Sequence, residues 1–552
     1  MKKYIYAFIA AVLAASGSLG AQDLDPTVVV NRAYEGKLLE VHKPSFEMEI
    51  PDTVSKFDLD FDYSVFDKPY KGAYEFTPYV LTLRPASESM DNKKLYLKAG
   101  AGYTLHPMLD FVWAPGLKGA FNVDVYGANR SYIGDYYKFT PAGSASSWSG
   151  YDIENKAGVD CSFDWRSGSI DLDVAYYGVA LKDDMKNRMY NAVDVALGIS
   201  SKAKGESYFK YALQADYRFG QDGLMIQDVQ SRIGEHLYGV DASFGQVIRK
   251  RHDVSVDMNA DLVTYSHPVY STTAGIFDVV PHYVLAGRRW AVDAGLRVSK
   301  LIRPAAHESM FSTKGQFLYP DVSAWFDVIP SAMRAYAYVG GGNQLNTYSS
   351  LLERNHHFDM TYASGLWPVM DVTVERISTS FGVEGRVGSK FSYDLRAGYV
   401  NYKNAPLDAV LVGAVDGQYL PGLGYDAYQK FYAGADMGLK FDSFTFDGNV
   451  EYTHAWGIDQ ASGLLAPAAL TGDVAVEYNW NRRIFAGVDC EFASKRNVVA
   501  GYADLGLNLE FAATRSLAFW FRGGNLLNMA IQRNPLYAEK GINFTLGICL
   551  NL

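Results

Sequence analysis

Runs in which hydrophobic and polar residues alternate with a period of two dominate this chain. The last eleven residues, 542–552, read INFTLGICLNL, so that Ile, Phe and Leu fall on one face and Asn, Thr, Gly and Cys on the other. A period of two is that of a β-strand with one apolar and one polar face. At about 3.3 Å per residue, such a strand can cross a hydrocarbon layer when it is tilted.

The same alternation recurs from about residue 95 to the C-terminus. Examples are 157–165, 170–176, 254–262, 444–452 and 473–480, where the polar face is rich in Asp, Asn, Glu and Ser. A soluble β-sandwich turns its apolar strand faces toward a core, whereas a transmembrane barrel turns them toward lipid. The strand pattern by itself fits both architectures.

The lengths of the connections distinguish the two. The predicted tight turns are 166–168, 248–251, 287–288, 330–331, 388–389, 442, 481–482 and 513–514. The predicted long links are 183–187, 266–273, 303–313, 343–370, 404–425, 458–470 and 529–540, with the rhythm failing only near 104–107. Short periplasmic turns that alternate with long outer loops are typical of membrane barrels.

The sequence therefore predicts an all-β fold, a transmembrane antiparallel β-barrel over residues 94–552. Counting the runs gives about 22 strands, with a range of 18–22, the first near 95–104. An aromatic content of 14% and a mean hydropathy of -0.10 are consistent with a barrel wall that faces lipid on one side and water on the other. The net charge of -10 argues against a nucleic-acid partner, which needs a basic footprint.

The N-terminal 93 residues differ from the rest. Residues 1–21 have two lysines, an apolar core and small residues up to Ala21, which is the pattern of a secretory signal peptide. Residues 22–93 are rich in Pro and acidic, and we expect an extended periplasmic leader that is able to enter the barrel lumen. A calcium loop over 57–65 is disfavoured because Tyr63 occupies the place that requires Gly. A solvated edge strand is the better interpretation.

The C-terminal part resembles the end of a TonB-dependent receptor barrel. Residues 517–521 lead into Asn525-Leu526-Leu527-Asn528, a loop with Pro535, and a closing strand after Gly541. Thr545 and Gly547 followed by Leu550 and Leu552 also resemble the signal for insertion of outer-membrane barrels. The stretch 95–103 after an acidic leader is similar to relatives that lack the plug domain of this family.

This resemblance implies an exported outer-membrane protein of a Gram-negative bacterium, surrounded by lipid and lipopolysaccharide. Residues 22–93 are too few for the plug of a receptor and contain no plug-like motif, so passive or gated transport of a polar solute is expected rather than energy-coupled uptake. The alternative is a scaffold subunit of an outer-membrane assembly or uptake complex, with an envelope protein as partner.

Catalytic motifs are not found in the sequence, and we expect neither an enzyme nor a cofactor nor a metal site. An enzyme that acts at the barrel rim is a less favoured alternative. His356-His357 with Glu353 and Asp359 is the densest group of possible metal ligands, but adjacent histidines in a long loop are interpreted as solvated. Cys161, Cys490 and Cys549 are too far apart for a disulfide framework and are expected to be packing residues.

The polar strand faces carry many charges that we expect to point into the lumen. These candidate lumen-lining residues are Asp160, Asp164, Asp171, Asp173, Asp257, Asp261, Arg297, Arg396, Asp447, Glu451, Asp473 and Glu477. Two interpretations stay open, a pore or docking cavity for polar or cationic solutes and a merely wetted wall. A barrel of this width would leak if it were empty, so the leader, the long loops or a partner must fill it.

Overall fold

The computed structural model describes residues 94–552, apart from 118, 142, 144, 185, 203–204, 227–228, 267–270, 305–310, 359–369 and 413–418. The predicted signal peptide (1–21) and leader (22–93) lie outside this range and stay predictions. No helix among the described residues is long and apolar enough to span a membrane.

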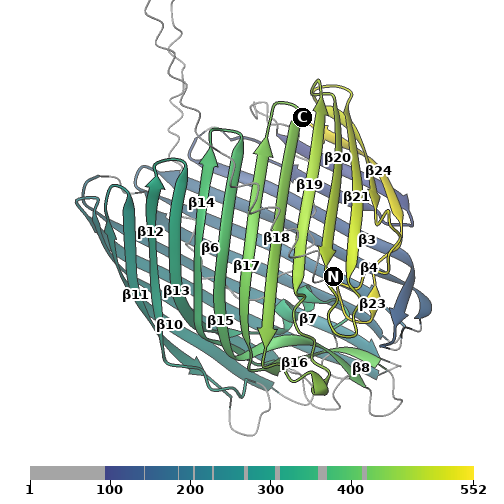
Figure 1. Ribbon diagram of the computed structural model, residues 1–552, viewed down its shortest axis with the longest axis horizontal. Coiled ribbons are helices and arrows are strands. Elements are labelled where there is room, and N and C mark those ends of the chain that lie inside the picture. The colour runs from purple at the N-terminus through teal and green to yellow at the C-terminus, as the bar shows by residue number, and fades with distance from the viewer. Residues whose placement is uncertain are drawn as a thin grey trace, which may run out of the picture. The chain divides into compact units, whose positions relative to one another are not determined.

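The described chain closes into an antiparallel β-barrel (Figure 1). Of its 24 strands, β16 (Tyr419–Asp426) and β23 (Tyr537–Ala538) only add to the loop end, and the other 22 form the wall. The ring closes where β1 (Leu95–Tyr103) pairs with β24 (Asn543–Asn551) on one side and with β2 (Met108–Trp113) on the other. The predicted fold and the count of 22 are confirmed.

The remaining wall strands follow one another around the ring and each pairs with its neighbours in sequence. They are β3 (Phe121–Phe139), β4 (Ala145–Trp165), β5 (Gly168–Lys182), β6 (Lys186–Ser201), β7 (Tyr208–Ile226), β8 (Val229–Ile248), β9 (His252–Ser266), β10 (Ser271–Ala286), β11 (Trp290–Ile302), β12 (Leu318–Ile329), β13 (Met333–Leu345), β14 (Val372–Val387), β15 (Phe391–Val412), β17 (Gln429–Lys440), β18 (Phe444–Trp456), β19 (Leu470–Trp480), β20 (Ile484–Ala493), β21 (Tyr502–Ala512) and β22 (Leu517–Gly524).

From β10 to the C-terminus, tight turns lie at one end of the barrel and longer links at the other, as predicted. Earlier in the chain the loop end also has short links, with three residues between β5 and β6 and two between β7 and β8. The turn between β19 and β20 shows how a tight turn is built. Asn481 and Arg482, in the three-residue link 481–483, have positive φ values of 53° and 56°. This is the conformation of a type I′ turn, whose twist matches that of the strands it joins. By the usual orientation of membrane barrels, this end faces the periplasm and the loop end faces outward.

The strands differ greatly in length. β4 has 21 residues, about 70 Å at roughly 3.3 Å per residue, whereas the apolar band of an outer membrane is about 25 Å tall. Hairpins β3 to β8 therefore continue pairing in water beyond the membrane. Two links predicted as long, 183–187 and 266–273, are shorter in the structure, because β6 begins at Lys186, β9 ends at Ser266 and β10 begins at Ser271. Part of the predicted loop 404–425 is likewise the hairpin formed by β15 and β16.

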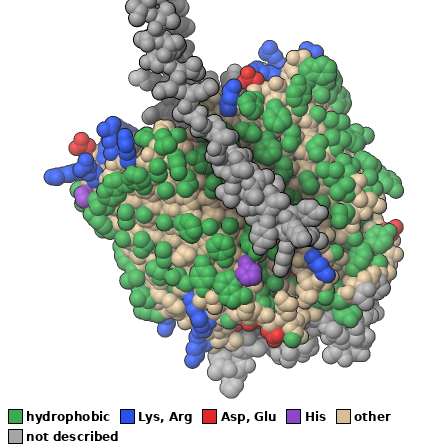
Figure 2. Space-filling model, in the orientation of Figure 1, with side chains coloured by type: hydrophobic (Ala, Val, Ile, Leu, Met, Phe, Trp, Pro, Cys, Tyr) green, Lys and Arg blue, Asp and Glu red, His purple; other side chains and the backbone are tan. Residues whose placement is uncertain are grey.

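The outside of the barrel is apolar (Figure 2). In the closing strand, Leu546 is 66% exposed and Phe544 38%, while Thr545 between them is 4% exposed. The same alternation appears on the other strands, as at Val159 and Phe163 of β4. The predicted facing of residues 542–552 is confirmed. Of the cysteines, all of them free, Cys549 is buried and the other two are partly exposed.

The densest packing lies inside the loop end of the barrel. There a cluster of buried apolar side chains joins wall strands to the links β11–β12 and β13–β14. Its members include Tyr177, Val179, Tyr190, Ile233, Val263, Tyr265, Phe311, Leu351, Leu352, Phe358 and Met370. The outer links thus fold into the mouth of the barrel and share a dry core with its wall.

The facing of β24 is testable by placing a charge on the lipid side. We expect Leu546→Arg to lower the free energy of unfolding by about 2–4 kcal/mol if Leu546 lies near the bilayer midplane, and by less toward the interfaces. Heat-modifiability on gels and urea unfolding in vesicles measure this change. Leu546→Phe, which stays apolar, serves as the control, and an arginine variant as stable as wild type would contradict the assigned facing.

Candidate functional site

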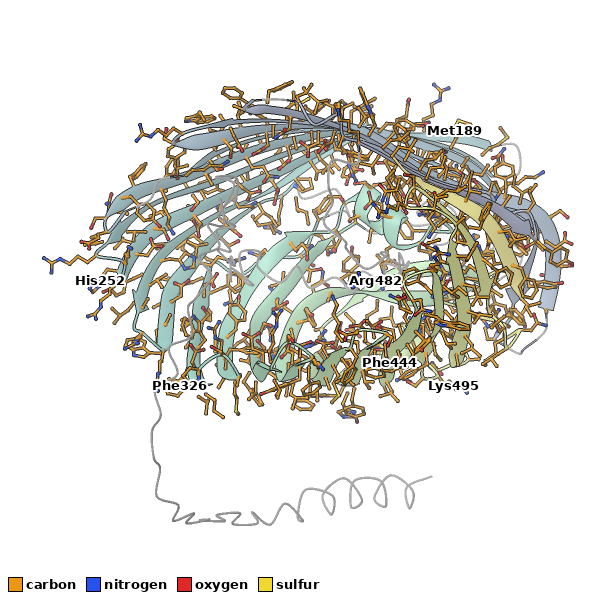
Figure 3. All side chains as sticks on the ribbon, turned by 90° about the horizontal axis from the view of Figure 1, so that it is seen from above. Met189, His252, Phe326, Phe444, Arg482 and Lys495 are labelled. Carbon is orange, nitrogen blue, oxygen red and sulfur yellow. The ribbon has the colours of Figure 1, made fainter. Side chains whose placement is uncertain are left out.

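A short helix from the link between β13 and β14 lies inside the ring of strands (Figure 3). This helix, α2 (Tyr348–Arg354), begins after Thr347, whose side chain accepts a hydrogen bond from the N–H of Ser350 at 3.3 Å. Serine and threonine satisfy free helix N–H groups in this way. Leu351 and Leu352 face the apolar cluster and are buried. We call residues 346–358 the lid loop.

The lid loop is tied to two distant parts of the wall. Glu353 forms an ion pair with Arg218 of β7 at 2.7 Å. Arg354 contacts Asp408 of β15 at 2.8 Å, and Asp408 also contacts Arg496 from the link after β20 at 2.9 Å. Strands β8 to β14 separate β7 from β15 around the ring. The end of the helix is therefore held between the wall at β7 and the part of β15 that extends toward the loop end.

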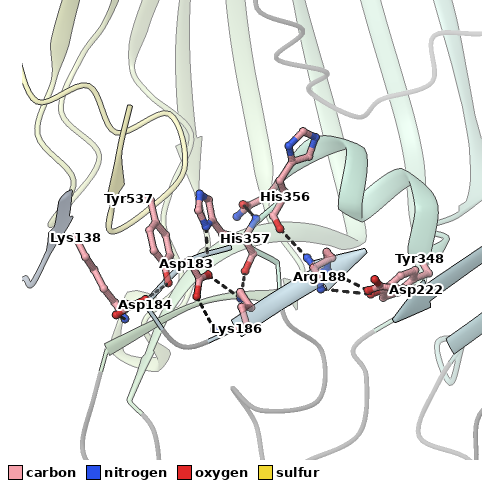
Figure 4. Close-up of polar contacts among 11 residues, drawn as sticks. Lys138, Asp183, Asp184, Lys186, Arg188, Asp222, Tyr348, His356, His357 and Tyr537 are labelled. Carbon is pink, nitrogen blue, oxygen red and sulfur yellow. Dashed lines mark hydrogen bonds and ion pairs between the residues drawn. The ribbon is translucent and has the colours of Figure 1, made fainter. Parts of the chain in front are cut away.

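A fully buried ion pair lies beneath the helix (Figure 4). Arg188 of β6 contacts Asp222 of β7 at 3.0 Å, and their side chains are 0% and 1% exposed. Tyr348 donates its hydroxyl hydrogen to Asp222, and Arg188 donates to the carbonyl oxygen of His356 at 2.6 Å. Because burial removes both charges from water, each depends on the other and on the lid loop for its hydrogen bonds.

The two histidines at the end of the lid loop each face a carboxylate. The His356 ring lies 3.0 Å from Asp152 of β4, and the His357 ring lies 3.4 Å from Asp183. His357 also stacks on Tyr537 of β23, with ring centroids 3.9 Å apart and planes at 5°. The interpretation of these histidines as solvated is wrong, because strands and loops remote in sequence enclose them.

Metal binding finds no support at these histidines. Asp359, which completed the predicted ligand group, lies outside the described residues. Among the residues that the structure describes, no group of three or more His, Cys, Asp or Glu side chains is arranged to hold a metal ion.

The surroundings shift the pKa values of the two rings in opposite directions. Burial opposes protonation of His356, but the negative charge of Asp152 outweighs it and raises the pKa of His356 above its usual value. Burial lowers the pKa of His357, Lys186 lowers it further, and Asp183 only partly compensates. The lid loop therefore carries one ring that favours the charged form and one that favours the neutral form.

The start of α2 is held by a buried carboxylate. Glu235 of β8 accepts hydrogen bonds from the N–H of Ser349 at 2.9 Å and from the hydroxyl of Tyr265 at 3.1 Å. The N–H of Tyr348 in turn donates to the Tyr265 hydroxyl at 3.0 Å. The free N–H groups at this helix end thus find partners on the wall, which fixes where the helix begins.

The residues predicted to line the lumen lie on the same side of the wall as the buried apolar cluster inside the barrel. Several meet other charges across strands. Arg297 contacts Asp321 at 3.0 Å and Asp278 at 3.8 Å. Arg396 contacts Asp436 and lies 3.9 Å from Glu451. Both predicted arginines are thus surrounded by carboxylates.

Other predicted residues meet acidic neighbours or a single cation. Asp160 lies directly opposite both Asp173 and Asp124 in the strand register. Asp257 is 3.4 Å from the His282 ring, and Asp164 pairs with Lys202. The register places the rest opposite neutral or acidic residues: Asp171 opposite Ser162, Asp261 opposite Gly239, Asp447 opposite Ala475, Asp473 opposite Asn449 and Glu491, and Glu477 opposite Thr445. Their contact with a solute stays a prediction.

Sequence reasoning missed the residues that hold the lid loop, chiefly Arg188, Asp222, Glu235 and Tyr537. The available signal was weak. Lys186 and Arg188 precede Tyr190 on one face of a strand, and this pattern is typical of any strand face that points into a water-filled lumen. Their partners on β7 and in the lid loop lie between 34 and 171 positions away in the chain, and no spacing rule connects them.

Comparison with solved structures gives the class of this fold. Over 83% of its length the chain is similar to the siderophore receptor PirA from Acinetobacter baumannii, covering 80% of that chain with a TM-score of 0.60 and 11% identity. It is similar to the FrpB iron transporter (F5-1 variant) from Neisseria meningitidis over 84% of its length and 82% of that chain, with a TM-score of 0.61 and 10% identity.

A third similar structure is a double mutant of the Serratia marcescens hemophore receptor HasR in complex with its hemophore HasA and heme. The match covers 85% of this chain and 81% of that one, with a TM-score of 0.60 and 11% identity. No protein-family model and no curated protein sequence matches. At these identities the likeness shows the fold alone, a closed 22-stranded antiparallel β-barrel like the barrels of these three proteins.

The buried ion pair predicts how firmly the lid loop is held. Arg188→Met leaves Asp222 buried without its cation, and we expect docking of the lid loop to weaken by about 3–5 kcal/mol. Arg188→Met combined with Asp222→Leu, which removes both charges, should restore most of the docking. Protease cleavage within 346–358 of the folded barrel measures this. Equal resistance of wild type and the single variant would contradict the role of the pair.

The two histidines predict opposite dependences on pH. The contribution of His356 to docking is present below its free pKa of about 6.5 and is lost as pH rises through the raised docked value. The contribution of His357 is present above about 6.5 and is lost as pH falls toward the lowered docked value.

Relative to wild type, His356→Gln should therefore lose docking mainly at acidic pH and His357→Gln mainly at alkaline pH. The same protease assay between pH 5 and 8 measures both, and each variant is the control for the other. Parallel pH profiles for the two variants would contradict this assignment.

Proposed function

We propose that this chain is a gated outer-membrane transporter of small polar solutes whose outer mouth is closed by its own lid loop. The observation that carries the proposal is the position of α2 inside the ring of strands, where ion pairs to Arg218 on β7 and Asp408 on β15 hold its end (Figure 3). A wide barrel needs such an obstruction to avoid leakage. The ion pairs and hydrogen bonds that hold the lid loop have a defined geometry. A bound solute or partner protein can replace these contacts with contacts of its own.

The charge of the inner wall supports a preference for cations. Below the lid loop, carboxylates such as Asp160, Asp173, Asp257 and Asp447 outnumber the arginines, and the arginines themselves are paired. A passage lined by one sign of charge concentrates ions of the opposite sign. The proteins of similar fold are named as receptors or transporters for siderophores, iron and heme, which is consistent with transport as the general class.

A second candidate function is a structural subunit of an envelope complex, as the sequence also suggested. The apolar cluster around Leu351, Leu352 and Phe358 supports this alternative, because removing these side chains from their dry surroundings costs free energy. On this view the mouth stays closed permanently, and the barrel serves as an anchor for other proteins.

Electrical recording distinguishes the two candidates. We compare the wild-type chain in planar bilayers with a variant in which residues 347–358 are replaced by a short Gly-Ser link. Transport predicts rare, small openings for wild type and a large, cation-selective conductance for the variant, measured from the reversal potential in a KCl gradient. A second variant, Arg188→Met, leaves the apolar cluster intact and should raise the open probability.

If neither variant conducts current, and heat-modifiability shows that both are folded, the transport proposal is overturned and the structural subunit is favoured. An anion-selective current would contradict the part of the proposal that concerns the acidic wall.

A further inference from the structure

The tight-turn end of the barrel is basic, although the chain as a whole has a net charge of -10. From the turn after β4 round to the turn after β21, every tight turn carries or directly adjoins at least one exposed Lys or Arg, apart from the turn between β12 and β13. These residues are Arg166, Lys202, Arg249, Lys250, Arg251, Arg288, Arg289, Lys390, Lys440, Arg482, Arg483 and Arg515, with Lys94 and Arg386 beside them. We call this set the basic rim.

Exposed carboxylates on the same turns are few. Glu206 and Asp442 are exposed there, and Asp164 pairs with Lys202. The loop end differs, since several of its cations are matched by nearby carboxylates, as at Arg218, Arg354 and Arg496. The positive charge is therefore concentrated at one end of the barrel.

The basic rim lies next to the lipid-facing surface. Ile248, directly before the Arg249 turn, is 41% exposed, and Trp290, directly after Arg289, is 38% exposed. Trp480 and Ile484, on either side of Arg482 and Arg483, are 59% and 39% exposed. Figure 2 shows Lys and Arg at the upper rim directly beside the hydrophobic surface. Aromatic side chains followed by cations mark the level of lipid headgroups.

We propose that the basic rim binds the anionic headgroups of phospholipids in the leaflet around the tight-turn end. The distribution of the cations favours lipid over an acidic protein. A protein partner would need one contiguous sector, whereas these residues follow the circumference and so face whatever surrounds the barrel on all sides. Long Lys and Arg side chains reach from an apolar wall to the headgroup level with little strain.

Bound anionic lipid sets the height and tilt of the barrel in the membrane. Near a surface, a Lys or Arg contributes enough attraction to anionic lipid to raise its local concentration about fivefold, and the attraction weakens within a Debye length as salt increases. This role concerns the periplasmic end and does not rest on the proposed transport function. It holds equally if the barrel is a structural subunit.

Tryptophan quenching by brominated lipids tests the proposal, because Trp290 and Trp480 lie beside the rim on the exposed surface. The full chain is reconstituted in phosphatidylcholine vesicles with either brominated phosphatidylglycerol or brominated phosphatidylcholine. We expect a preference of about fivefold for phosphatidylglycerol at low salt, which disappears near 1 M salt.

The variant removes four cations on two neighbouring turns, Arg249→Asn, Lys250→Asn, Arg288→Gln and Arg289→Gln. Asn is chosen for the first two positions because they have positive φ values of 52° and 53°. The preference should fall in this variant, because Trp290 loses the cations of its own turn and of the neighbouring turn. It should persist in the control, in which Lys182→Gln, Arg303→Gln and Lys495→Gln remove exposed cations at the loop end.

Equal quenching by both lipids in wild type would overturn the proposal and leave an acidic protein as the partner to seek. An equal loss in the control variant would also overturn it, since the effect would then follow net charge and not the rim. Heat-modifiability of each reconstituted variant ensures that only folded barrels are compared.

Discussion

The closed hydrogen-bond ladder of the wall is the constraint on which the rest of this structure depends. In hydrocarbon an unpaired N–H or C=O costs several kcal/mol, about as much as a protein has to spare. Pairing of β1 with both β24 and β2 leaves the ring without an edge. The consequence of closing so many strands is a wide interior, and a wide interior in a membrane needs an obstruction.

The lid loop is held in place by different interactions from those that hold the wall together. The lid loop lies in the water-facing part of the molecule, and it is held partly by apolar packing of Leu351 and Leu352 and partly by ion pairs such as Arg188 with Asp222. A buried ion pair adds little net stability over an apolar pair, but losing one partner is costly. Such contacts specify one position of the loop, and they suit the movable lid that we propose.

Charge divides the barrel into zones that match its surroundings. Apolar side chains face lipid, carboxylates dominate the inner wall, and unmatched cations gather at the tight turns. An alternating strand makes the first two zones with the same residues, because neighbours point to opposite faces. The third zone depends on the turns alone, where side chains are not constrained by either face.

The sequence by itself determined the wall, and only the tertiary structure decided what lies inside it. Alternation along a strand is local, so residues 542–552 revealed their facing and the runs before them gave the count of 22. The same period continues in hairpins outside the membrane, which is why the start of β6 was assigned to a loop. Contacts of the lid loop join residues far apart in the chain, such as His357 with Asp183 and Tyr537. Such pairs produce no periodic pattern in the sequence, because the closure of the ring, and not the spacing in the chain, brings them together.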